Sequence, residues 1–160
     1  QAYILAKMYT EASEHFNVLL AEDPNNIEIL GSLASVLTEL GDADTTRAQF
    51  YADSVQSLYD NLMNRPGLTE RDLFNAGVGL YQIENYAMAA EAFRKAADMN
   101  PFNRDARLNL AQTYYAASMW EELIPAARSL LLTPSAVRYI VHARRGRRGA
   151  NRIAVPELGS

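Results

Sequence analysis

The stretch Asn85–Pro101, NYAMAAEAFRKAADMNP, contains six alanines and closes on a proline. Its apolar residues recur at three- and four-residue spacing, which forms one stripe along an α-helix; they are Tyr86, Ala89, Ala90, Phe93, Ala96 and Ala97. Asn85 can cap the first turn, because its short side chain accepts a backbone N–H, and Pro101 cannot continue a helix. The stretch therefore predicts one helix between these two residues.

A second helical period lies directly before it, in residues 70–82, and is formed by Leu73, Ala76, Gly77, Leu80 and Tyr81. Thr69 and Asp72 are spaced like a capping box, with Asp in place of the usual Glu. The short polar break between the two periods predicts a helical hairpin. Gly77 and Ala89 are expected on the facing sides, where larger side chains would push the helix axes apart.

The same pattern returns along the chain. A shift of 34 residues places Leu110 and Ala111 where Ala76 and Gly77 stand, and Pro134 falls one residue before the position that corresponds to Pro101. Towards the N-terminus the offset is 43, and we expect the nine extra residues to lengthen a second helix over about 44–64. Its apolar stripe is predicted to contain Phe50, Val55, Leu58, Tyr59 and Leu62.

These residues resemble the tetratricopeptide repeat, a 34-residue helix-turn-helix module, in the order Leu73-x2-Ala76-Gly77-x2-Leu80, then Ala89-x3-Phe93, then Pro101. The resemblance covers residues 1–134, as a partial unit 1–26 and units 27–69, 70–103 and 104–134, so we expect the chain to start inside a repeat. It implies an all-α, right-handed α-solenoid. The first helix of each unit would line a concave groove, and the second would lie on the convex side.

The composition narrows the classes of function. The chain has 160 residues, of which 49% are apolar and 21% charged, as in ordered proteins, and it has no Cys. No apolar run reaches 18 residues, which predicts a soluble or peripheral protein, cytoplasmic or periplasmic. His15 and His142 are far apart in the sequence, and no glycine-rich phosphate loop is present. We therefore expect no catalytic residue, no metal site and no cofactor.

The expected binding surface consists of the side chains that packing leaves free on the first helices. In the third and fourth units these are Arg71, Phe74, Val78, Tyr81, Gln82, Leu108, Gln112 and Tyr115. Large rings and aliphatic chains favour an apolar helix or an extended peptide as ligand, although each residue could instead pack between units. Relatives in this family that bind a C-terminal carboxylate use Lys and Arg here. Phe74, Val78 and Leu108 do not fit that mode.

The charge divides the chain in two, because residues 1–134 carry a net charge of −9 and residues 135–160 a net charge of +5. We expect a capping helix over 135–145 and a basic, disordered tail over 146–160. The cations of this region are Arg138, Arg144, Arg145, Arg147, Arg148 and Arg152. No aromatic residue lies within 142–152 to stack on bases, so nucleic acid is disfavoured. A solvated tail, or one that docks on an acidic surface of this protein or of a partner, is preferred over contact with the phosphates of nucleic acid or of an anionic lipid surface.

The leading hypothesis is a non-enzymatic interaction module or scaffold that holds a protein or peptide in its concave groove. The alternative is a structural or assembly subunit, fixed in a larger complex through its convex face, its long helix and its basic tail. A third hypothesis is that the repeats accompany a catalytic domain in a longer parent protein.

Overall fold

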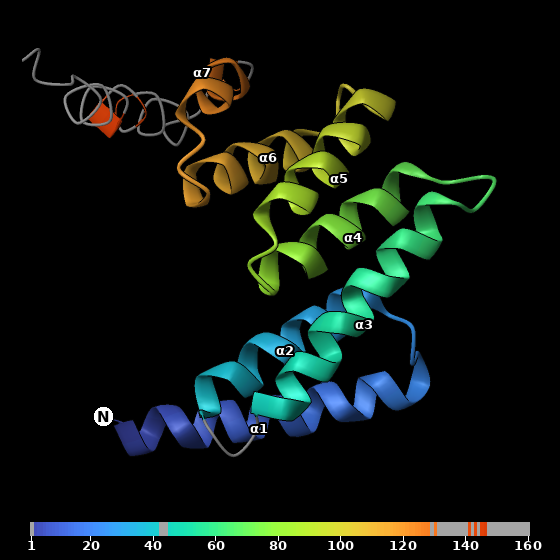
Figure 1. Cartoon of the computed structure of the whole chain (residues 1–160), viewed down its shortest axis with the longest axis vertical. Helices are drawn as coiled ribbons and strands as arrows, with labels where there is room; N and C mark the ends of the chain where they lie inside the picture. Colours follow the sequence, from blue (N-terminus) through green and yellow to red (C-terminus); the bar gives the residue numbers. More distant parts are fainter. Residues whose placement is uncertain are drawn as a thin grey trace, which may run out of the picture.

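The computed structural model describes residues 2–41, 45–128, 130, 141, 143, 145 and 146 of the 160-residue chain. Within these residues the protein is all-α, without a strand, as the sequence predicts. Seven helices follow one another and pack in chain order (Figure 1). They are α1 (Ala2–Glu22), α2 (Ile27–Leu40), α3 (Thr45–Met63), α4 (Glu70–Gln82), α5 (Tyr86–Met99), α6 (Arg104–Ala116) and α7 (Trp120–Arg128).

Side-chain caps define where several of these helices begin. The Thr69 hydroxyl accepts the backbone N–H of Asp72, and the Asp72 carboxylate accepts the backbone N–H of Thr69, so the predicted capping box is confirmed. The predicted cap at Asn85 is also confirmed, because its Oδ1 accepts the N–H of Met88 at 3.4 Å. Asn26 and Asn103 cap α2 and α6 in the same way.

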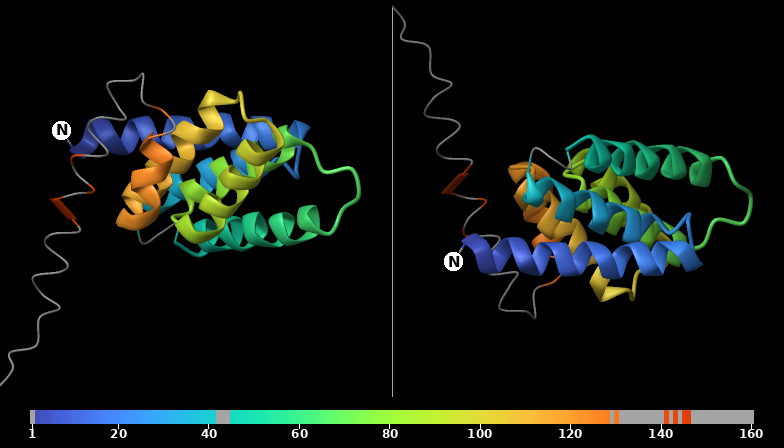
Figure 2. Two further views of the ribbon diagram at one scale, coloured as in Figure 1. Left: turned by 90° about the horizontal axis from the view of Figure 1, so that it is seen from above. Right: turned by 90° about the horizontal axis from the view of Figure 1, so that it is seen from below.

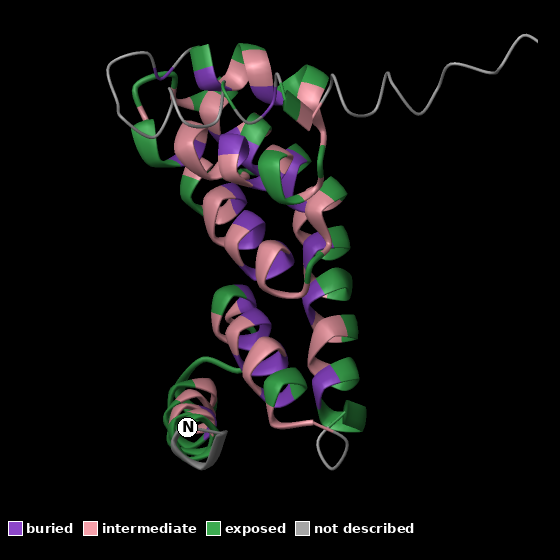
Figure 3. Ribbon diagram, turned by 90° about the vertical axis from the view of Figure 1, so that its left-hand side faces the viewer, coloured by how far each residue is buried: buried purple, intermediate pink, exposed green. Residues whose placement is uncertain are grey.

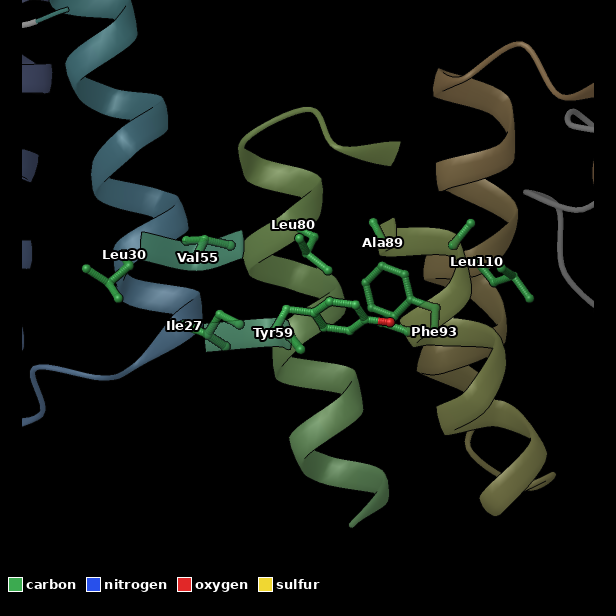
Figure 4. Packing of buried hydrophobic residues seen from close by; sticks show 11 residues of the cluster. Ile27, Leu30, Val55, Tyr59, Leu80, Ala89, Phe93 and Leu110 are labelled. Atoms are coloured by element: carbon green, nitrogen blue, oxygen red, sulfur yellow. The ribbon is translucent and has the colours of Figure 1, made fainter. Parts of the chain in front are cut away.

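The helices form pairs, and their buried residues gather in four hydrophobic clusters. Helices α2 and α3 pack closely, as do α4 and α5, and α4 also lies along α2. The predicted hairpin of residues 70–100 is confirmed. Figure 3 shows the buried residues on the facing sides of the helices, and Figure 4 shows the largest cluster crossing from α2 to α6. The labelled members of that cluster are Ile27, Leu30, Val55, Tyr59, Leu80, Ala89, Phe93 and Leu110.

One residue of the long helix departs from the expected stripe. Val55 and Tyr59 are buried in α3, but Phe50 is 65% exposed. Five residues separate Phe50 from Val55, and at about 100° per residue this turns the Phe50 side chain well away from the buried face. The assignment of Phe50 to the core stripe is therefore wrong.

Glycine allows α2 and α4 to touch through their backbones. A Cβ on Gly31 would lie 2.7 Å from the Cα of Gly79, and a Cβ on Gly79 would overlap the carbonyl oxygen of Ile27. Neither partner atom belongs to a side chain that can rotate away. The contact at Gly77 differs, because a Cβ there would meet the ring of Phe93 at 2.7 Å. This confirms that Gly77 faces the second helix of its hairpin.

We expect Gly79→Ala to destabilise the protein by about 2–3 kcal/mol, because the two backbones must separate, and overpacking of this kind exceeds the gain in helix propensity. Gly77→Ala is the matched control in the same helix. It should cost less, since the Phe93 ring can shift. Urea unfolding followed by circular dichroism measures both variants. Equal stability of Gly79→Ala and the wild type would contradict the backbone contact.

The hydroxyl of Tyr59 is buried in this core and has no hydrogen-bond partner among the described residues. Burial, followed by the nearby carboxylates of Glu91 and Asp60, raises the pKa of Tyr59 to about 12. Both observations indicate that the ring contributes packing, while its hydroxyl lowers stability.

Tyr59→Phe is therefore expected to leave the melting temperature unchanged or to raise it by a few degrees, corresponding to about 1 kcal/mol. In the unfolded chain the phenol has a pKa of about 10, so the wild type loses stability as the pH rises from about 10 to 12. The variant should lose less. Melting curves at pH 8 and pH 11, with Tyr51→Phe as control, measure this. A large loss of stability at pH 8 would show that the hydroxyl has a partner.

Candidate protein-binding surfaces

The predicted groove residues lie on α4 and α6, and most of them also contribute to packing. Phe74, Val78 and Tyr81 are half-buried against the largest core cluster. The Phe74 ring meets the ring of Phe93 edge to face, with centroids 5.7 Å apart. Leu108 packs against a second cluster, so for these four residues the structure shows the packing role that the sequence had left open.

The remaining members of the set are more accessible. Arg71 is exposed at the start of α4, and Gln82 and Gln112 are half-buried. Tyr115 is 38% exposed near the end of α6, where its ring lies edge to face against Trp120 at 5.9 Å. The equivalent pair in the preceding hairpin is Tyr81 and Tyr86 at 5.4 Å. Each of these two ring pairs therefore holds a tyrosine at the end of its helix.

Three depressions open between the helices. The first, of about 450 Å³, lies between α3 and α4 beside the α1–α2 turn; it is lined by Asp23, Asn25, Asn26, Ile27, Leu58, Asn61, Leu62, Arg65, Asp72 and Asn75. The second, of about 680 Å³, lies between α1 and α3. The third, of about 300 Å³, is lined in part by Gln82, and the other seven predicted groove residues line none of the three.

Two of the three charged residues that line the first depression, Arg65 and Asp72, form an ion pair. Arg65 Nη2 lies 3.3 Å from Asp72 Oδ2. Hydrogen bonds from the side chain and the backbone of Thr69, and the charge of Arg65, hold the pKa of Asp72 below its usual value. Asp72 therefore stays ionised at neutral pH and serves as a helix cap.

Among the residues that the structure describes, no group of three or more His, Cys, Asp and Glu is placed to hold a metal ion. None of the helices described there combines the length and hydrophobicity that spanning a bilayer requires.

The basic C-terminal residues lie largely outside the described part of the chain. Arg145 is exposed, whereas Arg138, Arg144, Arg147, Arg148 and Arg152 are not among the described side chains. Ala143 is fully buried with Leu123 and Ala127 of α7. A Cβ on Gly146 would meet the Trp120 ring at 2.5 Å. Ala143 belongs to the segment that was expected to cap the array, and Gly146 is the first residue of the expected tail; both lie against α7.

Sequence reasoning missed the second depression. Its apolar lining includes Phe50, which had been placed in the core, and Leu20 and Leu30 from two other helices. The offset of five residues between Phe50 and Val55, which does not fit the spacing of one helical stripe, was the available signal. The depression itself depends on how α1 and α3 lie relative to each other, which periodicity does not specify.

Comparison with known protein families gives no matching family model, and no curated protein matches the sequence. No family is therefore assigned to the chain, whose described residues form seven packed helices.

Proposed function

We propose that the chain is a non-enzymatic protein-interaction module, a solenoid of tetratricopeptide-like hairpins that binds an apolar helix or an extended peptide along α4 and α6. The observation that carries this proposal is the position of Tyr115. Its side chain is 38% exposed, and its ring lies edge to face against the ring of Trp120. A large ring held in one orientation loses little entropy when a partner covers it.

Further support comes from the order of the helices. Hairpins joined by short turns pack on one another in sequence, as in repeat proteins, where each module buries its apolar face against the next. The 34-residue echo of the hairpin of α4 and α5 extends over α6 and α7. In the structure α6 packs on α5 of the preceding hairpin, so a ligand that contacts both α4 and α6 would span two hairpins.

The test uses a partner that co-purifies with the full chain and is identified by mass spectrometry. Tyr81→Ala combined with Tyr115→Ala is expected to weaken binding by roughly 1–3 kcal/mol in calorimetry. Phe102→Ala is the control, because Phe102 is 91% exposed on the turn between α5 and α6 and lies outside the proposed surface. Unchanged affinity of a folded double variant would refute binding along α4 and α6.

A second candidate is a structural subunit fixed in a larger complex, and the exposed apolar residues of α1 and α3 favour it. Leu5, Met8, Val18 and Leu19 on α1 are 45–64% exposed, and Phe50 on α3 is 65% exposed. Exposed apolar side chains in such number on neighbouring helices are typical of surfaces that a partner covers.

This second candidate predicts that the isolated chain self-associates or aggregates unless a partner is co-expressed. Size-exclusion chromatography with light scattering measures the mass of the species. A monodisperse monomer over a tenfold range of concentration would contradict the subunit hypothesis. The interaction module would then be the favoured proposal.

A further inference from the structure

The second depression, which we call the α1–α3 groove, has an apolar floor and an aromatic rim. Figure 2 shows α2 between α1 and α3, and both of these helices pack on it. Leu30 of α2 lines the groove between Leu20 of α1 and Leu58 of α3. Tyr51 and the exposed Phe50 belong to the same lining, with their rings edge to face at 5.5 Å.

A carboxylate lies at this groove, and a second one lies just beyond it. Asp53 lines the groove, and Asp23 lines the first depression, which adjoins the groove because both contain Asn25 and Leu58. Asp53 accepts a hydrogen bond from Gln49 Nε2 at 2.7 Å, and Asp23 accepts one from Asn26 Nδ2 at 3.1 Å. Within the described part of the chain neither carboxylate forms a salt bridge with Lys or Arg.

The part of the chain that includes α1, α2 and α3 carries a net negative charge. Residues 1–63, which include α1, α2 and α3, contain ten Asp and Glu but only two Lys and Arg. Residues 64–134 are almost balanced, with eight acidic and seven basic residues. The excess negative charge is therefore concentrated in the part of the sequence that includes the three helices of the groove, and such an excess favours cationic partners.

We propose that the α1–α3 groove binds a basic amphipathic helix of another protein. Its apolar face would cover Leu20, Leu30 and Phe50, and its Lys or Arg side chains would lie beside Asp23 and Asp53. A volume of about 680 Å³ is within the range of pockets that take several large side chains. Helix-in-groove binding uses apolar anchors at i, i+3 or i+4, and i+7, which matches a trough with two helical walls.

The basic C-terminal segment of a second copy is the other cationic candidate. That segment has a net charge of +5, but its Ala143 is buried beside α7 and its Gly146 lies against Trp120 of the same chain. Apolar residues that already pack within their own chain do not remain free to fill a second groove. The structure therefore favours a foreign helix.

The probe is a fluorescent peptide of about 18 residues, five helical turns, with leucine on one face and lysine on the other. Anisotropy titration of the full chain is expected to show binding that weakens as the NaCl concentration rises from about 50 to 300 mM. Phe50→Ala, and separately Asp23→Asn with Asp53→Asn, should each weaken binding by about fivefold or more. A matched peptide with glutamate in place of lysine should not bind.

Matched controls exclude general attraction to an acidic protein. Phe102→Ala removes a ring that is more exposed than Phe50, and Asp105→Asn with Glu122→Gln removes two exposed carboxylates from α6 and α7. Both controls should leave the affinity within about twofold of the wild type. Equal weakening by the controls, or no effect of the groove variants, would overturn the proposal. Displacement of the probe by a peptide of residues 137–152 at lower concentrations than the leucine–lysine peptide requires would also overturn it, in favour of a second copy.

Discussion

The backbone contact between α2 and α4 is the constraint on which the rest of the arrangement depends. At Gly31 and Gly79 the two helices approach so closely that a single Cβ would overlap main-chain atoms. Because α4 packs closely on α2, it makes few contacts with α3. The first depression lies in the space left between α3 and α4. One pair of glycines thus brings two hairpins together and leaves room for the first depression beside them.

Small side chains also determine how the core around α5 is packed. Four alanines of α5 are buried, and Phe93 is the one large side chain of that helix in the cluster, beside Gly77. Small residues allow helices to approach closely, and a ring then fills the remaining volume. The contrast with α1 and α3 is marked, since several large apolar side chains of those helices remain exposed. The hairpin of α4 and α5 is thus closely packed, whereas α1 in particular keeps large apolar side chains in contact with solvent.

The two proposed surfaces differ in chemistry for this reason. The α4 and α6 surface presents tyrosines fixed by neighbouring rings, within a part of the chain that is nearly neutral. The α1–α3 groove combines an apolar lining with one carboxylate, Asp53, which forms no salt bridge among the described residues, and it lies in the most acidic part of the sequence. Since the residues do not overlap, loss of one binding activity leaves the other measurable, and a partner with two segments could use both.

The sequence by itself determined the helices, several of their ends and the small-residue face between α4 and α5. The Thr69–Asp72 box and the Asn85 cap are made within four residues, and the apolar period follows from helix geometry, so both can be read locally. The tertiary structure decided that Gly31 meets Gly79, that Phe74 and Val78 help to pack the core, and that Phe50 stays at the rim of a groove. An apolar stripe indicates which side of a helix is buried. Which neighbour covers that side depends on contacts between residues far apart in the chain.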